Sequence, residues 1–404
     1  MNDLRNELYE EILGQIDLGT ELPDETLYAV IDRTISERGR EKGLNYSEKK
    51  KLREILFSSL RRMDILSIAM EDESVTEIMV NGPEQIYIEQ NGRLKLFDEC
   101  FTTPEKLADI VQQIAASVNR RINEASPMVD ARLPDGSRAN LAISPAVIGG
   151  PVICIRRFPK TPLSMENLIE MGAISEECAA FLKGLVQAGY NIFISGGTGA
   201  GKTTFLGALA EYIPADERVI TIEDSAELRL RNVKNLVRME CRPANLEGEY
   251  EITIRDLIKN ALRMRPDRII VGEIRSEEAL DMLQAMNTGH DGSLSTGHAN
   301  SAADMVSRIE TMVLMGKELP ISAIRKQIAS GIDFFIHLGR LRDKSRRVLG
   351  VYEVDGMEEG EVKLHALFEF RETGVKNGKV EGMLFRTEEP FRHTEKWLAR
   401  NGQL

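Results

Sequence analysis

Hydrophobic positions follow one period and then another in the first part of the chain. Apolar residues such as Leu52 and Leu56 recur at spacings of three and four, which is typical of an amphipathic helix. Further on the period becomes two, and Asn91-Gly92 joins two alternating runs, which favours a β-hairpin. The pattern predicts a helical module over residues 1–70 and an α+β domain over residues 71–157.

The rest of the chain has a different organisation. Residues 158–164 contain two prolines and are predicted to form a linker that could act as a hinge. Within residues 165–341, short apolar runs such as 268–271 alternate with helical stretches. This alternation predicts an α/β domain whose parallel sheet has helices on both faces. Residues 342–404 break the alternation and are predicted to be a C-terminal extension.

Composition and charge narrow the classes of partner. With a net charge of -12, the chain is not expected to bind nucleic acid broadly, because affinity for a phosphate backbone comes mainly from Lys and Arg. No apolar run reaches the length of a membrane span, so we expect a cytoplasmic protein. The 4 cysteines have neither metal-ligand nor redox-motif spacing, so neither a zinc site nor a disulfide framework is expected.

A Gly-x-x-x-x-Gly-Lys-Thr segment carries the strongest chemical signal. It follows a predicted strand and precedes helix-forming residues, which is the context of a phosphate-binding loop. Lys202 is expected to reach the terminal phosphates of ATP, and the Thr203 hydroxyl to bind Mg²⁺. The alternative is a glycine-rich turn with an exposed lysine. The predicted nucleotide-binding residues are Gly196, Gly197, Thr198, Gly199, Ala200, Gly201, Lys202, Thr203 and Thr204.

Two acids at the ends of apolar runs are candidates for catalysis. Glu273 ends the run that begins at Arg268, and Gly272 stands where an Asp is usual in such a strand. Glu223 ends the apolar run before it. An acid at such a position can hold Mg²⁺ or orient the attacking water, and which of the two acids activates the water stays open. A solvated loop with structural ion pairs is the alternative for Glu223.

Residues 289–300 place two histidines, His290 and His298, among small and hydroxyl residues. Such a segment suits a strand that ends near a γ-phosphate, although a histidine there is often only an ordinary hydrogen-bonded residue. Taken together and in this order, the three elements resemble the ATPase superfamily of type II and type IV secretion and type IV pili. The glycine loop resembles its Walker A, residues 220–228 its Asp box, 269–275 its Walker B, and 289–300 its His box.

Three further segments are similar to the CpaF/TadA branch, which drives tight-adherence (Flp, type IVc) pili: residues 127–138, 252–267 and 285–292. The resemblance implies a RecA-like P-loop domain after a PAS-like domain, with ATP and Mg²⁺ as ligands and His298 as a catalytic residue. It also implies a homohexamer at the cytoplasmic face of the membrane, working on a membrane platform protein to assemble or retract a pilus. The cysteine tetrad of some type II secretion ATPases is absent.

Arginines before the linker are further candidates. Arg156 and Arg157 directly follow an apolar run, so closure at the hinge could bring a guanidinium to the phosphates of ATP. The resemblance adds Arg138, with Arg121 and Arg132 as weaker candidates. The alternative is that these side chains are solvated or make interdomain ion pairs.

Three other functions remain open. They are an ATPase of a type IV secretion or competence system, a nucleic-acid motor, and a nucleotide-gated regulator with negligible turnover. A nucleic-acid motor is disfavoured by the net charge, and a regulator by the presence of two candidate catalytic acids.

Overall fold

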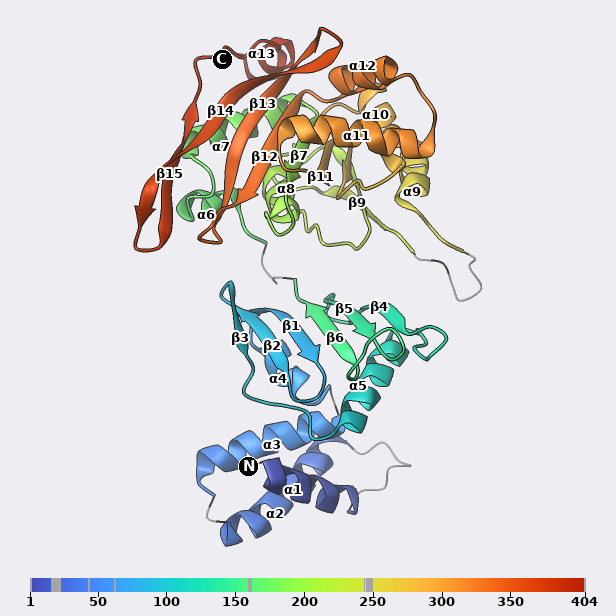
Figure 1. Cartoon of the computed structure of the whole chain (residues 1–404), viewed down its shortest axis with the longest axis vertical. Helices are drawn as coiled ribbons and strands as arrows, with labels where there is room; N and C mark the ends of the chain where they lie inside the picture. The colour runs from blue at the N-terminus through green and yellow to red at the C-terminus, as the bar shows by residue number, and fades with distance from the viewer. Residues whose placement is uncertain are drawn as a thin grey trace. The chain divides into compact units, whose positions relative to one another are not determined.

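The computed structural model describes residues 2–15, 23–42, 44–61, 63–158, 162–242, 244 and 250–402 (Figure 1). The chain divides into two compact units, Met1–Lys160 and Thr161–Leu404. Residues 159–161 of the predicted hinge lie outside the described residues. Among the residues described, no helix is long and apolar enough to cross a membrane.

The first unit begins with three helices that share a small core. They are α1 (Asn2–Leu13), α2 (Asp24–Glu41) and α3 (Tyr46–Arg61). Apolar side chains from all three pack together, including Leu8, Leu27 and Leu56. The rings of Tyr28 and Phe57 stack with their centroids 4.0 Å apart. The helical periodicity therefore gives a helical module with a core of its own.

A six-stranded antiparallel sheet follows, in the order β3-β2-β1-β6-β5-β4. Helix α4 (Leu66–Glu71) precedes it, and α5 (Pro104–Ser117) packs its apolar residues against the sheet. Asn91 and Gly92 have φ angles of 53° and 73°, which confirms the predicted hairpin turn. The finer likeness to a PAS domain stays a prediction. The strands are β1 (Val75–Asn81), β2 (Ile86–Gln90), β3 (Arg93–Leu96), β4 (Met128–Arg132), β5 (Arg138–Ala142) and β6 (Val152–Arg156).

The second unit is built around a nine-stranded sheet in the order β15-β14-β13-β12-β7-β11-β10-β8-β9. Its strands are β7 (Ile192–Gly196), β8 (Arg218–Glu223), β9 (Asn235–Glu240), β10 (Arg268–Val271), β11 (Leu294–His298), β12 (Phe334–Arg340), β13 (Arg346–Glu358), β14 (Glu361–Lys376) and β15 (Lys379–Arg386). Its helices are α6 (Met165–Glu170), α7 (Glu176–Ala188), α8 (Lys202–Ala210), α9 (Ile254–Ala261), α10 (Glu278–Asn287), α11 (Ala302–Gly316), α12 (Ile321–Gly331) and α13 (Glu395–Asn401).

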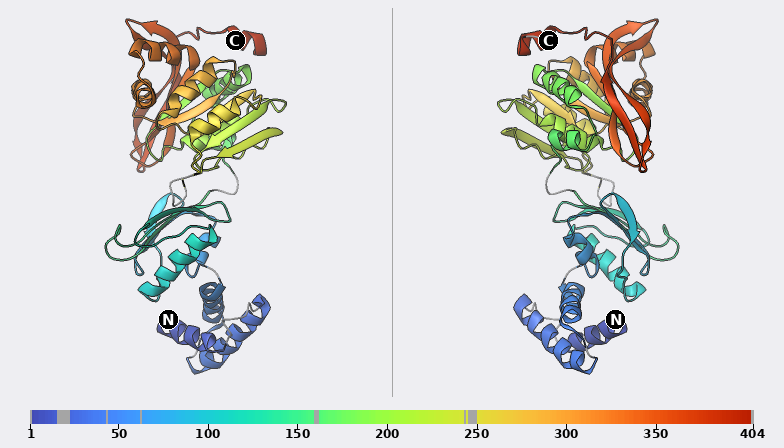
Figure 2. Two further views of the ribbon diagram at one scale, coloured as in Figure 1. Left: turned by 90° about the vertical axis from the view of Figure 1, so that its right-hand side faces the viewer. Right: turned by 90° about the vertical axis from the view of Figure 1, so that its left-hand side faces the viewer.

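Both faces of the central strand β7 are buried, and its successive side chains point to opposite faces of the sheet. On β7, Ile192 and Ile194 belong to the core shared with α6, α7 and α8. Phe193 belongs to the core shared with α9, α10, α11 and α12. Helices therefore cover both faces, as predicted, and Figure 2 shows them on either side of the sheet.

The parallel sheet predicted for residues 165–341 is confirmed, and the antiparallel strands of the sheet come from residues 342–404. Strands β12, β7, β11, β10, β8 and β9 are parallel, but β13, β14 and β15 are antiparallel. Residues 342–404, expected as an extension, thus contribute three strands to the same sheet. Helix α13 then packs on α7, where a Cβ added at Gly184 would lie 2.1 Å from the ring of Trp397.

Candidate nucleotide site

Strand β7 leads directly into the glycine-rich loop. All residues of β7 are buried, and α8 begins at Lys202 directly after the loop. Gly199 and Gly201 have φ angles of 70° and 90°, which other residues rarely adopt. A Cβ added at Gly196 would lie 2.5 Å from the carbonyl oxygen of Leu338 on the adjacent strand. The local backbone and packing therefore require these glycines.

The start of α8 suits an anion. The helix has no side-chain cap, because Gly201 occupies the N-cap position. The first N–H groups of a helix have no partner within it, and together with the helix dipole they favour a negative charge. The predicted nucleotide-binding residues, from Gly196 to Thr204, lie on this loop and on the first turn of α8.

Three predicted catalytic residues lie in contact beside the loop. Lys202 is buried, and its Nζ lies 3.2 Å from the carbonyl oxygens of Gly196 and Gly197. The same Nζ lies 3.2 Å from Nδ1 of His298, at the end of β11. Nε2 of His298 lies 2.9 Å from Oε1 of Glu273, without the alignment of a hydrogen bond. The phosphate-binding lysine is thus connected to a candidate catalytic acid through one imidazole.

Burial lowers the pKa of His298, and the positive charge of Lys202 acts in the same direction, whereas Glu273 raises it. The imidazole is therefore expected to be neutral near pH 7. Arg275 donates to Oε2 of Glu273 at 3.0 Å. Glu273 thus lies between two basic side chains, and its side chain is only 20% exposed.

Glu223, at the end of β8, is almost fully buried. Its Oε2 accepts the backbone N–H groups of Glu227 and Leu228 at 2.8 and 2.9 Å. Its Oε1 has no hydrogen-bond partner. Burial raises the pKa of Glu223 to about 7, although the two backbone hydrogen bonds act in the opposite direction. The alternative of a solvated loop residue therefore does not describe Glu223.

Gly272 allows Glu223 to occupy its position. A Cβ added at Gly272 would lie 3.0 Å from Cγ of Glu223, which comes from the neighbouring strand. The carboxylate of β8 therefore fills the space beside the end of β10. Gly297, on β11, also lacks room for a larger side chain, because a Cβ there would lie 2.8 Å from Met305 and 3.1 Å from Phe193.

The residues present fit Mg²⁺. The donors are the Thr203 hydroxyl on the first turn of α8 and the carboxylates of Glu223 and Glu273, which are the oxygen ligands that Mg²⁺ prefers. One buried oxygen of each carboxylate has no hydrogen-bond partner. Among the residues described, no group of three His, Cys, Asp or Glu could hold a metal by itself. Phosphate oxygens of the nucleotide would complete such a site.

Other predicted residues lie elsewhere. His290 precedes β11, and its Nδ1 lies 3.2 Å from the carbonyl oxygen of Ala285. Arg121 lies in the first unit, as do Arg132, Arg138 and Arg156, which are direct partners across β4, β5 and β6.

Arg157 is held by its own unit. It donates to the carbonyl oxygens of Asp72 and Val75, the latter at 2.9 Å. This guanidinium therefore fixes the segment between α4 and β1, which disfavours the predicted role at the phosphates. The interaction was not predictable from sequence, because it joins residues far apart in the chain.

Sequence reasoning also missed a residue beside the loop. Arg346, the first residue of β13, donates from Nε to the carbonyl oxygen of Gly199 at 2.8 Å. Its place in a basic cluster, residues 340–347, was the only signal in the sequence.

The strand, glycine loop and helix, with carboxylates at the ends of neighbouring strands, define a P-loop ATPase. The chain belongs to the family described as Type II/IV secretion system protein, whose model matches residues 62–386. It is accordingly an ATP hydrolase of the secretion-system ATPases.

Individual proteins show the same relationship. A candidate conjugal transfer protein of Mycobacterium tuberculosis is 33% identical over 300 residues, which cover 73% of this chain and 85% of that protein. The type IV secretion system protein PtlH of Bordetella pertussis is 31% identical over 311 residues, covering 70% and 92%. The pilus retraction motor PilT, crystallised with ADP, has the same fold, with a TM-score of 0.53, 21% identity and coverage of 84% and 86%.

Proposed function

We propose that the chain is the motor ATPase of a type IV secretion or conjugal transfer machine, acting as a homohexamer on membrane platform proteins. The observation that carries the ATPase part of the proposal is the contact of Lys202 with His298, and of His298 with Glu273. The relatives named for conjugal transfer and type IV secretion support this kind of machine.

Each residue of the site has its own proposed role in ATP hydrolysis. Lys202 and the N-terminus of α8 stabilise charge on the terminal phosphates, as in other P-loop enzymes. Glu273 or Glu223 accepts the proton of the attacking water. His298 bridges the lysine and the acid, so it is placed to respond to the γ-phosphate. When bound, Mg²⁺ would neutralise charge between the β- and γ-phosphates, held by Thr203 and the two acids.

Arginines of the first unit complete the proposal. Arg138 and Arg156 are direct cross-strand partners, so their side chains project from the same face of the sheet. One phosphate group can accept charge-assisted hydrogen bonds from two such guanidiniums. We therefore retain them as arginines that approach the nucleotide when the units close through the linker, residues 158–164. We also propose that the domains have the boundaries predicted from the sequence.

Assembly of a Flp-like pilus is the second candidate function. It is favoured by the likeness of residues 127–138, 252–267 and 285–292 to the CpaF/TadA branch. In either case we propose that the protein is cytoplasmic and peripheral at the membrane. It would hydrolyse ATP and would not bind nucleic acid.

The enzymatic part is tested by steady-state phosphate release from the purified chain. Lys202→Ala should lower turnover by about a hundredfold or more, because it removes phosphate neutralisation while the loop glycines remain. Unchanged turnover in a folded Lys202→Ala protein would contradict the site. DNA or RNA should not stimulate hydrolysis by the wild-type chain.

The kind of machine that the chain serves is tested in the source cell. The gene is deleted, and the deletion strain is complemented with the wild-type or the Lys202→Ala gene. Loss of conjugal transfer or protein export, restored by the wild type alone, would support the first candidate. Loss of surface pili with transfer and export intact would favour the second.

A further inference from the structure

Two arginines form a like-charged pair on the hairpin of β12 and β13. Arg340 ends β12, Arg346 begins β13, and the two are direct partners in the antiparallel register. Both are exposed. Among the residues described, neither has a carboxylate within ion-pair distance. Like charges directly opposite each other destabilise an antiparallel pair, so this position carries uncompensated positive charge.

Both side chains border the glycine-rich loop. Nε of Arg346 donates to the carbonyl oxygen of Gly199 at 2.8 Å, and its Cδ would lie 3.2 Å from a Cβ added at Gly201. Nη1 of Arg340 would lie 3.7 Å from a Cβ added at Gly199. A hydrogen bond to a carbonyl oxygen uses one N–H group and leaves the charge of the guanidinium uncompensated. The other N–H groups of Arg346 remain for a ligand.

The hairpin is fixed before any ligand binds. Asp343 accepts the backbone N–H and the hydroxyl of Ser345 at 2.9 and 2.6 Å through one oxygen, and the N–H of Val380 on β15 at 2.8 Å through the other. The hydrogen bond from the Ser345 side chain, followed by that from Val380, lowers the pKa of Asp343 to about 2. The turn between the two arginines is therefore rigidly connected to the edge of the sheet.

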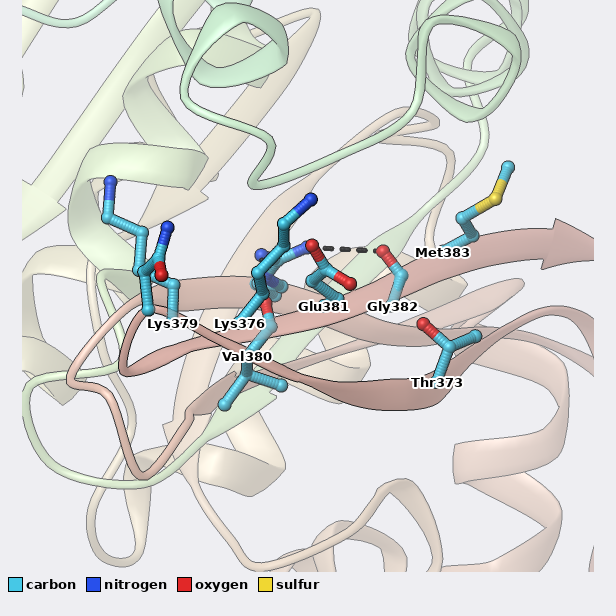
Figure 3. Close-up of a pocket in the computed structure, with 9 residues that line it drawn as sticks. Thr373, Lys376, Lys379, Val380, Glu381, Gly382 and Met383 are labelled. Atoms are coloured by element: carbon cyan, nitrogen blue, oxygen red, sulfur yellow. Dashed lines mark hydrogen bonds between the residues drawn. The ribbon is translucent and has the colours of Figure 1, made fainter.

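The other two arginines of the hairpin have different tasks. Arg342 pairs with Glu372 on β14. Arg347 donates to the carbonyl oxygens of Val380 and Gly382 on β15, which line the hollow at this edge (Figure 3). Arg342 is thus neutralised and Arg347 anchors the strand, whereas Arg340 and Arg346 lie at the phosphate loop.

We propose that Arg340 and Arg346 form a clamp for the phosphate groups of the nucleotide bound at the loop of the same chain. The inference rests on the proposed nucleotide site. Guanidinium groups bind phosphate oxygens through paired, charge-assisted hydrogen bonds. A polyphosphate between the two side chains supplies the negative charge that this cross-strand pair lacks. The clamp is distinct from Arg138 and Arg156, because it belongs to the unit that carries the loop.

The test measures the affinity of the full chain for ADP and for a non-hydrolysable ATP analogue. Arg340→Gln and Arg346→Gln should each weaken binding by roughly ten- to a hundredfold, the range for a charged hydrogen bond. Both should also reduce the dependence of affinity on salt. Arg342→Gln is the matched control from the same hairpin and should bind like wild type. The thermal stability of nucleotide-free Arg340→Gln should be unchanged or higher, because a repulsive pair is removed.

The outcomes separate the clamp from the site on which it rests. If Lys202→Ala loses affinity while both arginine variants bind like wild type, the clamp is refuted and the loop assignment stands. If Lys202→Ala binds nucleotide normally, the proposed site itself fails. Arginine variants that alter ring assembly but not affinity would show that an acidic group of a neighbouring subunit is the true partner, which also overturns the clamp.

Discussion

Replacing Glu223 by Gln should make the stability of the nucleotide-free protein less sensitive to pH. The pKa of this buried carboxyl is raised from 4.5 to about 7. Because the folded-state pKa lies above the unfolded value, the protonated form stabilises the fold at low pH, and this contribution is lost as the pH rises through 7. Between pH 5 and 8.5 the wild type should lose about 2.5 kcal/mol that the variant does not lose.

The assay compares thermal unfolding of the two proteins at pH 5 and at pH 8.5. The difference in Tm between variant and wild type should change by roughly 5–10 °C in favour of the variant at the higher pH. Glu211→Gln is the control, because Glu211 also accepts two backbone N–H groups but in a more exposed position. A difference in Tm that is the same at both pH values would refute the burial argument. Glu223→Gln should at the same time lower ATP turnover.

Three more outcomes are expected. Glu273→Gln should keep nucleotide affinity while lowering turnover, measured by equilibrium binding and phosphate release; wild-type turnover would remove Glu273 from the chemistry. Arg156→Ala should lower turnover with little change in Tm, whereas Arg157→Ala should lower the Tm of the first unit, since it removes the hydrogen bonds that hold the segment between α4 and β1; equal Tm values would contradict this distinction. Gly184→Leu should displace α13 and shift the fluorescence of Trp397, the only tryptophan, to the red; an unchanged spectrum would mean that α13 does not depend on this contact.

The sequence was most informative where local pattern determines structure. The strand, loop and helix around Gly201 were predictable because one short segment contains all three. The pairing of Arg340 with Arg346 was not, because it depends on the register of a hairpin. The proximity of Glu223 to Gly272 was also hidden, since it requires β8 and β10 to be neighbours in the sheet.

The antiparallel strands β13 to β15 change how the chain can be shortened. A truncation after residue 341 looks harmless from sequence, but it would leave β12 as a bare edge next to the strand that carries the phosphate loop. It would also remove Val351 and Phe368 from the core, and so expose apolar side chains that they cover, such as Phe181. Unpaired backbone groups and apolar side chains on such an edge favour strand addition between molecules. A fragment designed to isolate the ATPase domain should therefore end beyond β15, or it will aggregate for reasons unrelated to nucleotide.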